Sequence, residues 1–174
     1  MSGKNSIFRS PEGETHSYAA YDAVLAHWPV PYEEQDLLTQ FGHTHIIASG
    51  PDGAKPVILM HGQDSSAASW IYNISDLSRA FRIYAVDTIG DMGKSKPARL
   101  PINREDYALW VLDVLDQLKL EKANLVGLSY PSQARITSAS LIASTAWRVA
   151  NPGCPGPTPT SLTMLMPSSP PGTR

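Results

Sequence analysis

Several features that would indicate a compartment or a charged partner are missing from the sequence. Its 174 residues include one cysteine, Cys154, which excludes an intrachain disulfide framework and a cysteine-rich zinc site. No apolar run approaches the roughly 20 residues of a membrane-spanning helix, and the first residues lack the apolar segment of a secretory signal. The net charge of −2 gives no electrostatic footprint for nucleic acid or an anionic membrane. We therefore expect a cytoplasmic protein that binds neither nucleic acid nor a membrane.

The C-terminal part of the sequence lacks whole classes of side chain. All 16 acidic residues lie at or before Glu121, and all 5 histidines lie at or before His61. The 45 residues after Ser129 hold only three arginines as charged residues, but 8 of the 15 prolines and 13 serines and threonines. This segment therefore provides no carboxylate side chain and no imidazole. Its last part, residues 151–174, is rich in proline, serine and threonine and is expected to be disordered or extended.

The earlier residues alternate between patterns of buried strands and patterns of helices. Three short runs are apolar at successive positions, as in strands of a parallel sheet covered on both faces. We expect strands at 57–60, 82–87 and 124–128, helices at 14–27, 65–79 and 103–118, and a hairpin of 35–40 with 43–48. This order predicts an α/β fold of about five mostly parallel strands with flanking helices and an antiparallel pair at one edge.

The three buried strands run into three short motifs. The motifs read PVILMHGQ at 56–63, RIYAVDTIGDMGKS at 82–95 and NLVGLSY at 124–130. In this order and at this spacing they resemble the first half of an alpha/beta hydrolase, over roughly residues 32–130. The resemblance implies a partial alpha/beta hydrolase fold that ends at the turn carrying the nucleophile. It also implies hydrolysis of a carboxylic ester or a related small acyl substrate.

Ser129, in the stretch GLSYP, falls at the nucleophile position of the G-x-S-x-G turn of that family. A serine hydroxyl is a weak nucleophile, so it needs a base, an orienter for the base, and donors for the oxyanion. The resemblance implies that the backbone amides of Gln63 and Tyr130 are those donors. It further implies that the loop around them is supported by His61, Gly62 and Gly127. We expect no metal and no other cofactor.

Two departures from the family pattern concern this chemistry. The family places an Asp or Glu and then a His after its serine, and neither residue type follows Ser129. His61 is a poor substitute, because its position in the family shapes the oxyanion loop. Pro131 stands where the family has glycine; it disfavours a helical conformation at Tyr130 and crowds a close contact. We expect a weakly active or inactive enzyme, and the alternative is a non-catalytic pseudoenzyme that acts as a binding module.

The change of composition after Tyr130 suggests a hypothesis about the tail. It is the product expected from a shifted reading frame, aberrant splicing or truncation. The chain then divides into an N-terminal helical segment (1–30), the hydrolase-like half (31–130), a possible helix of non-family sequence (131–150) and the disordered tail (151–174). A sheet that ends with strand 124–128 exposes an apolar edge, so self-association through that edge is expected.

Two competing motifs were weighed against this interpretation. The stretch ending in Lys94-Ser95 suggests a phosphate-binding P-loop, but the required first glycine falls at Thr88. His43 and His45 alternate onto one face of a strand, as two metal ligands would. No third ligand is evident, so a solvated or hydrogen-bonded pair is the better prediction. In the hydrolase interpretation, the loop from Asp87 to Ser95 is mainly structural.

Overall fold

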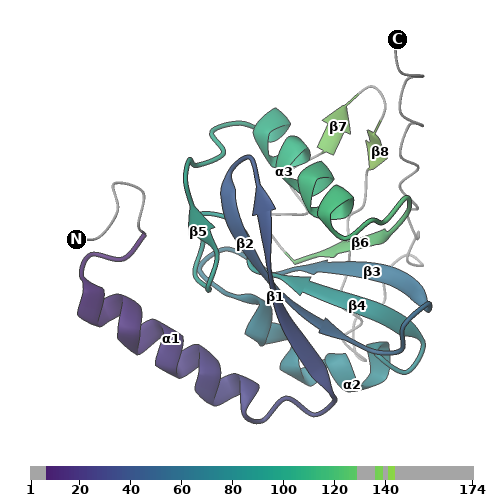
Figure 1. Cartoon of the computed structure of the whole chain (residues 1–174), viewed down its shortest axis with the longest axis horizontal. Coiled ribbons are helices and arrows are strands. Elements are labelled where there is room, and N and C mark those ends of the chain that lie inside the picture. The colour runs from purple at the N-terminus through teal and green to yellow at the C-terminus, as the bar shows by residue number, and fades with distance from the viewer. Residues whose placement is uncertain (1–6, 129–135, 139–140, 144–174) are drawn as a thin grey trace, which may run out of the picture.

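A mixed sheet forms the centre of the computed structural model, which describes residues 7–128, 136–138 and 141–143 (Figure 1). Its main strands lie in the order β1-β2-β4-β3-β6, and a short strand, β5, also pairs with β2. The strands are β1 (Tyr32–Thr39), β2 (Gly42–Ser49), β3 (Lys55–Met60), β4 (Phe81–Val86), β5 (Lys96–Pro97) and β6 (Asn124–Gly127). β3 is parallel to β4 and β6, whereas β2 is antiparallel to β1 and β4. The predicted fold class and hairpin are confirmed, and β5 is a strand of this sheet that was not predicted from the sequence.

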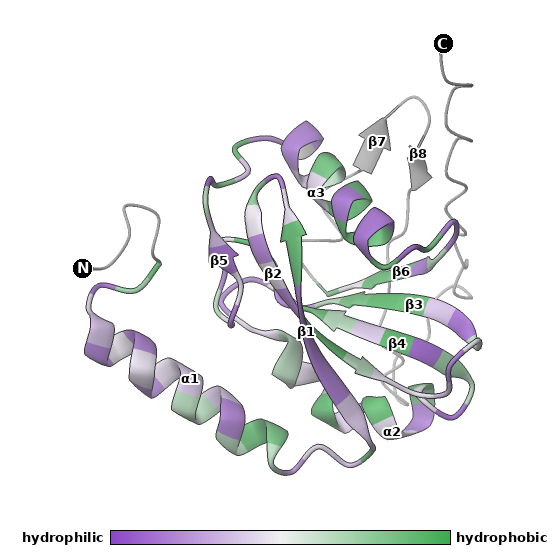
Figure 2. Ribbon diagram, viewed as in Figure 1, coloured by the Kyte–Doolittle hydropathy of each residue, from purple (hydrophilic) through white to green (hydrophobic). Residues whose placement is uncertain are grey.

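Helices cover both faces of this sheet. The helix α3 (Arg104–Gln117) packs on one face, and α1 (Pro11–Leu25), the 3-10 helix η1 (Ala67–Tyr72) and α2 (Ile74–Leu77) pack on the other. Neighbouring strand residues therefore join different cores: Ile46 of β2 packs with α3, and Ile47 packs with α1 and η1. Figure 2 shows the apolar residues gathered along the central strands β3 and β4. Two covered faces explain why these strands are apolar at successive positions.

The two long helices begin at polar caps that the sequence supplies. Ser10 Oγ accepts a hydrogen bond from the Gly13 amide at 3.1 Å, and Pro11 occupies the first turn, where its missing N–H costs nothing. Asn103 Oδ1 accepts from the Asp106 amide at 2.8 Å and starts α3. The predicted helix at 103–118 is thus confirmed, and α1 begins three residues before its predicted start at 14.

Two predicted helices differ in the structure. Residues 65–79 form η1 and α2 with Asn73 between them, not one helix. Ser69 Oγ donates to the Ser66 carbonyl at 2.8 Å, a local bond of the kind that competes with a regular α-helix.

Within the predicted helix at 131–150, the described residues form two short antiparallel strands, β7 (Ile136–Ser138) and β8 (Leu141–Ala143). Ile and Thr are β-branched and favour strands. The rest of 131–150 and all of 151–174 lie outside the described residues. Within the described part of the chain, no helix has the length and apolar character needed to cross a bilayer.

Candidate functional site

The carboxyl ends of the three parallel strands meet at one edge of the sheet. Met60, the last residue of β3, pairs with Val86 of β4 on one side and Gly127 of β6 on the other. The Leu128 amide then donates to the Met60 carbonyl at 3.1 Å, so β6 stays beside β3 up to its last described residue. Ser129 and Tyr130 come next in the chain and lie outside the described residues. Such an edge is the usual location of ligand sites in open α/β sheets.

His61 is fully buried at this edge, and both of its ring nitrogens are bonded to backbone groups. The Thr88 amide donates to Nε2 at 2.9 Å, so Nε2 carries no proton. Nδ1 therefore holds the ring proton and donates it to the Gly62 carbonyl at 2.7 Å. In this tautomer His61 has no free nitrogen to accept a proton from another side chain. Its role is to join the end of β3 to the end of β4.

The loop from His61 to Ala67, which contains Gln63, is held by two further bonds. The Asp64 amide donates to Asp91 Oδ1 at 3.1 Å, and the Ala67 amide donates to Asp87 Oδ1 at 2.7 Å. Asp64 adopts a left-handed backbone conformation with φ of 55°, which is uncommon outside glycine. The loop turns sharply there and presents the exposed Gln63 just before the turn.

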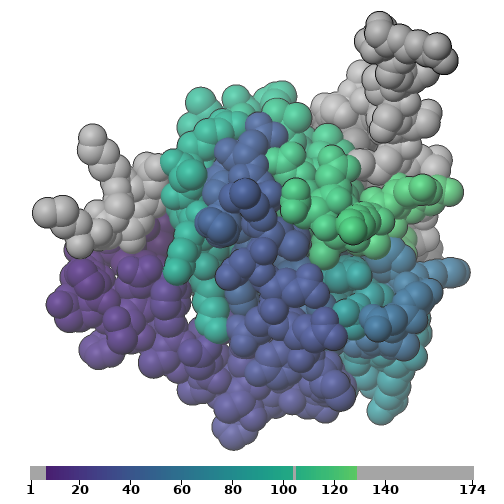
Figure 3. All heavy atoms as spheres, viewed as in Figure 1, coloured from purple at the N-terminus to yellow at the C-terminus, as the bar shows by residue number. Residues whose placement is uncertain are grey.

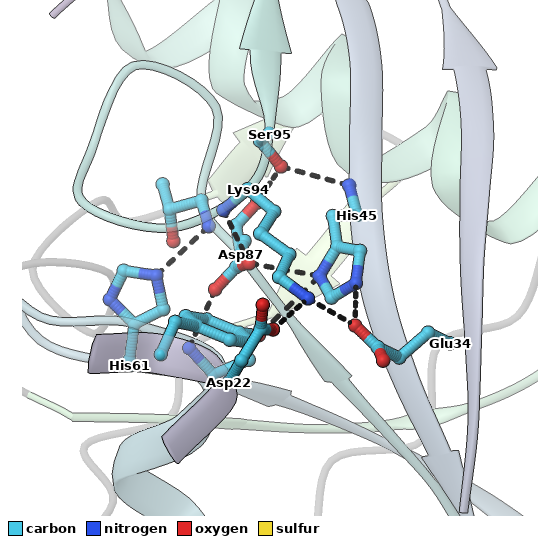
Figure 4. Close-up of polar contacts among 10 residues, drawn as sticks. Asp22, Glu34, His45, His61, Asp87, Lys94 and Ser95 are labelled. Carbon is cyan, nitrogen blue, oxygen red and sulfur yellow. Dashed lines mark hydrogen bonds and ion pairs between the residues drawn. The ribbon is translucent and has the colours of Figure 1, made fainter. Parts of the chain in front are cut away.

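Asp87 is the central acceptor of the site and is completely buried. Besides Ala67, its carboxylate accepts a bond from the Lys94 amide at 2.9 Å, and Oδ2 lies 3.0 Å from Nδ1 of His45 (Figure 4). The other ring nitrogen of His45 lies 3.0 Å from Glu34 Oε2. Each ring nitrogen of His45 thus faces a carboxylate oxygen, which accepts a hydrogen bond from any ring nitrogen that carries a hydrogen. The buried Asp87 side chain thereby has hydrogen-bond partners at both oxygens.

Lys94 connects this network to the N-terminal helix. Its ammonium lies 2.6 Å from Asp22 Oδ1 of α1 and 2.6 Å from Glu34 Oε2 of β1. Burial lowers the pKa of Lys94, but its hydrogen bonds to Asp22 and Glu34 outweigh that effect and raise the pKa above its ordinary value. The ammonium also lies over the Tyr21 ring, and burial, together with the charge of Asp87, raises the pKa of the Tyr21 phenol. Figure 3 shows α1 lying along this flank of the molecule.

The loop between β4 and β5 is shaped by the same carboxylate. Gly93 has φ of +148°, and a Cβ added there would lie 2.4 to 2.8 Å from atoms of the Asp87 carboxyl group. Only glycine leaves room for that group. Ser95 Oγ donates to the Asp87 carbonyl at 2.7 Å and accepts from the His45 amide at 2.9 Å. Residues 87–95 are therefore built around Asp87.

The structure brings together four of the predicted site residues. His61, Gly62 and Gln63 follow β3, and Gly127 ends the neighbouring strand β6. The charged network around Asp87 was not predicted from the sequence, although the loop from Asp87 to Ser95 was interpreted as mainly structural. Of the histidine pair, His45 is hydrogen-bonded and His43 is exposed, as the non-metal interpretation predicted. Among the residues that the structure describes, no three His, Cys, Asp or Glu side chains are grouped as metal ligands would be.

Residues 55–131 match a family model described as the alpha/beta hydrolase fold. The chain is 47% identical over 112 residues to the uncharacterized carboxylesterase nap of Bacillus subtilis (strain 168), and 48% identical over 122 residues to carboxylesterase YbfK of the same organism. The crystal structure of carboxylesterase CesB (YbfK) from Bacillus subtilis superposes with a TM-score of 0.69 and 47% identity.

These matches cover most of the chain but a smaller share of each relative. The two sequence matches span 64% and 70% of this chain, and 37% and 41% of the relatives. The structural match covers 71% of this chain and 43% of the other. The chain thus spans about two fifths of the length of the curated relatives that it matches. Residues 55–131, which the family model matches, contain the strands that form the edge described above.

Proposed function

The chain carries the N-terminal part of the alpha/beta hydrolase fold, and on this premise we propose that it is, by lineage, a serine hydrolase of carboxylic esters or related small acyl substrates. Ser129 is the nucleophile position of the proposal, and the backbone amides of Gln63 and Tyr130 are the oxyanion donors. The observation that carries the proposal is the pairing of β6 with β3, which brings the strand before Ser129 beside the loop of Gln63. The identity of nearly one half to two carboxylesterases over the same region supports the substrate class.

We further propose that this 174-residue polypeptide turns over esters weakly or not at all. No Asp, Glu or His follows Ser129 in its sequence, and the two buried histidines of the described region are both engaged. His61 is bonded at both nitrogens to backbone groups, and His45 is bonded at both nitrogens to carboxylates. A serine without a base keeps its proton. In well-studied proteases, removal of the triad leaves about 10³- to 10⁴-fold catalysis over water.

A fluorophosphonate probe and an aryl acetate test the proposal together. We expect slow labelling of the purified chain that is lost in Ser129→Ala and kept in Ser69→Ala, whose hydroxyl lies on the exposed side of η1. Aryl acetate hydrolysis should stay within about 10⁴-fold of the buffer rate. Labelling that persists in Ser129→Ala would remove Ser129 from the proposal. Steady turnover at rates typical of esterases would remove the claim of weak activity.

The second candidate function is a non-catalytic binding module, a pseudoenzyme built on the same fold. The engaged nitrogens of His61 and His45 favour it, because they leave the edge able to bind an acyl group but not to move a proton. Absence of fluorophosphonate labelling combined with binding of a non-hydrolysable ester analogue in a calorimetric titration would support this candidate. Labelling at Ser129 would exclude it.

Three further statements belong to the same proposal. The change in composition after Tyr130 supports a tail that arose from a shifted reading frame, aberrant splicing or truncation. The coding DNA tests the shifted reading frame, because another frame should then contain codons for Gly-Gly and, later, for Asp and His. The single cysteine supports a cytoplasmic location. β6 ends the strand order of the described sheet, which supports self-association through that edge.

A further inference from the structure

One short segment after β4 holds the loop of Gln63 at three separate points. Thr88 donates its amide to His61 Nε2 at 2.9 Å, at the start of the loop. Asp91 Oδ1 accepts the Asp64 amide at 3.1 Å in the middle, and Asp87 Oδ1 accepts the Ala67 amide at 2.7 Å at the end. The loop residues are 61–67 and all three partners lie within 87–91. No strand pairing is responsible for these bonds, so the segment fixes the loop by side-chain and amide contacts.

The two carboxylates differ in how they are built into the molecule. Asp87 is fully buried, and its second oxygen is bonded to the Lys94 amide and to His45. Removing its charge therefore disturbs the core as well as the loop. Asp91 is only partly buried, and its Oδ1 alone accepts both the Asp64 amide and the Met92 amide, the latter at 2.8 Å. A substitution of Asp91 therefore affects the 61–67 loop with little direct effect on the core.

The position of the middle contact is what gives it chemical meaning. Asp64 directly follows Gln63 and has φ of 55°, so the chain turns immediately after Gln63 in a conformation that a non-glycine residue adopts reluctantly. The Gln63 N–H itself lies in the preceding peptide unit, whose Gly62 carbonyl accepts a hydrogen bond from His61 Nδ1 at 2.7 Å. An oxyanion donor is effective only if its N–H direction is fixed before the reaction. The bond from the Asp64 amide to Asp91 holds that turn in place.

We propose that Asp91, together with Asp87, is a positioning residue that fixes the direction of the Gln63 amide by holding the 61–67 loop onto the 87–91 segment. The role assigned to Gln63 rests on the proposed function, whereas the loop coupling rests on the hydrogen bonds alone. Neither carboxylate contacts a reacting atom. The carboxylates act through the backbone of Asp64 and Ala67 (Figure 4 shows Asp87 among its partners).

Residue-resolved amide hydrogen exchange on the full chain tests the coupling. In Asp91→Ala, we expect the Asp64 amide to exchange about five- to tenfold faster, the effect of losing one ordinary hydrogen bond. The Ile47 amide, in the middle of β2, should keep its rate. Asp91→Asn keeps an oxygen that can accept both amides, so its loop should exchange as in the unchanged chain.

Three results would overturn the proposal. They are unchanged exchange of the Asp64 amide in Asp91→Ala, an equal acceleration of the Ile47 amide that signals general destabilisation, and an Asp64 amide that exchanges as fast in Asp91→Asn as in Asp91→Ala. Asp87→Asn serves as a second variant: its side chain has one accepting oxygen in place of two, so one of the Ala67 and Lys94 amides should lose its acceptor and exchange faster than the amides of β2.

Aryl acetate kinetics separate this proposal from the function on which it rests. If the unchanged chain has measurable turnover, Asp91→Ala should lower kcat at least about fivefold with KM within about twofold, because an oxyanion donor acts in the transition state. A rise in KM at constant kcat would overturn the positioning role. If the unchanged chain has no turnover, the catalytic part of the proposed function fails, and the exchange rates still decide whether the carboxylates hold the loop.

Discussion

At the scale of single residues, the Asp87 carboxylate determines what can stand next to it. Its oxygens take hydrogen bonds from the Ala67 and Lys94 amides and from His45, and the chain returns past it at Gly93 without a side chain. These hydrogen bonds satisfy a buried polar group whose burial would otherwise cost free energy. The glycine is a consequence of that arrangement, because any Cβ would occupy the space of the carboxyl group.

Gly93→Ala should therefore destabilise the protein far more than a glycine substitution in an open turn. Gly53 is the matched control, since it also has a positive φ, of +78°, but nothing lies within 4 Å of an added Cβ. We expect Gly53→Ala to cost about 1–2 kcal/mol of unfolding free energy from its left-handed backbone. Gly93→Ala should cost about 1–3 kcal/mol more from overpacking against Asp87. Urea unfolding of both variants measures the difference, and equal losses would contradict the crowding.

At the scale of elements, α1 is attached to the sheet by an apolar side and by one cation. Tyr21, Leu25 and Trp28 are buried against η1 and the sheet, and the Trp28 indole donates to Ser49 Oγ at 3.1 Å. Lys94 adds the polar attachment through Asp22. Through Lys94, α1 thus contacts the loop of residues 87–95, although α1 and this loop are far apart in the sequence.

The Lys94 attachment predicts a pH dependence. Because the hydrogen bonds to Asp22 and Glu34 raise the pKa of Lys94 above the ordinary 10.5, the ammonium stabilises the folded chain fully below that pH. The contribution is lost as the pH rises through the raised pKa. At pH 8, Lys94→Met should therefore have a lower urea midpoint of unfolding than the unchanged chain. The difference between the two midpoints should become smaller above pH 10.5.

The raised pKa values of Tyr18 and Tyr21 also reduce stability at high pH, and both tyrosines are present in the unchanged chain and in Lys94→Met. Lys55→Met is a suitable control for the loss of one positive charge, because Lys55 is exposed at the start of β3. A difference in urea midpoint between Lys94→Met and the unchanged chain that stays constant from pH 8 to pH 11 would contradict the ion-pair role of Lys94.

At the scale of the whole molecule, the sheet has an edge at β6 within the described residues. Its residues Val126 and Leu125 belong to the two opposite cores, so the strand is apolar on both faces. We expect self-association that depends on concentration, with the thermal midpoint rising as the protein is concentrated. Sedimentation velocity over a hundredfold range of concentration measures this. A monomer at every concentration, with one sharp and concentration-independent melt, would contradict it.

Much of the architecture could be predicted from the sequence because burial on two faces leaves a direct mark. The runs that became β3, β4 and β6 are apolar at successive positions over most of their length, and α3 carries its apolar stripe at helical spacing. The predicted helix at 65–79 was wrong, since periodicity does not register a side chain such as Ser69 that bonds its own backbone. The network around Asp87 was missed because its partners are distant in sequence: His45 lies 42 residues away. Ion pairs of this kind exist only once the strands are assembled.

The ion pair between Lys94 and Asp22 of α1 also implies an order of events during synthesis. Lys94 is added 72 residues after Asp22, its partner on the helix (94 − 22), which at roughly 5–20 residues per second takes about 4 to 14 seconds. Throughout that interval the N-terminal helix exists without the cation that will hold it. A chaperone that covers Tyr21, Leu25 and Trp28 would therefore be able to bind them before Lys94 is translated.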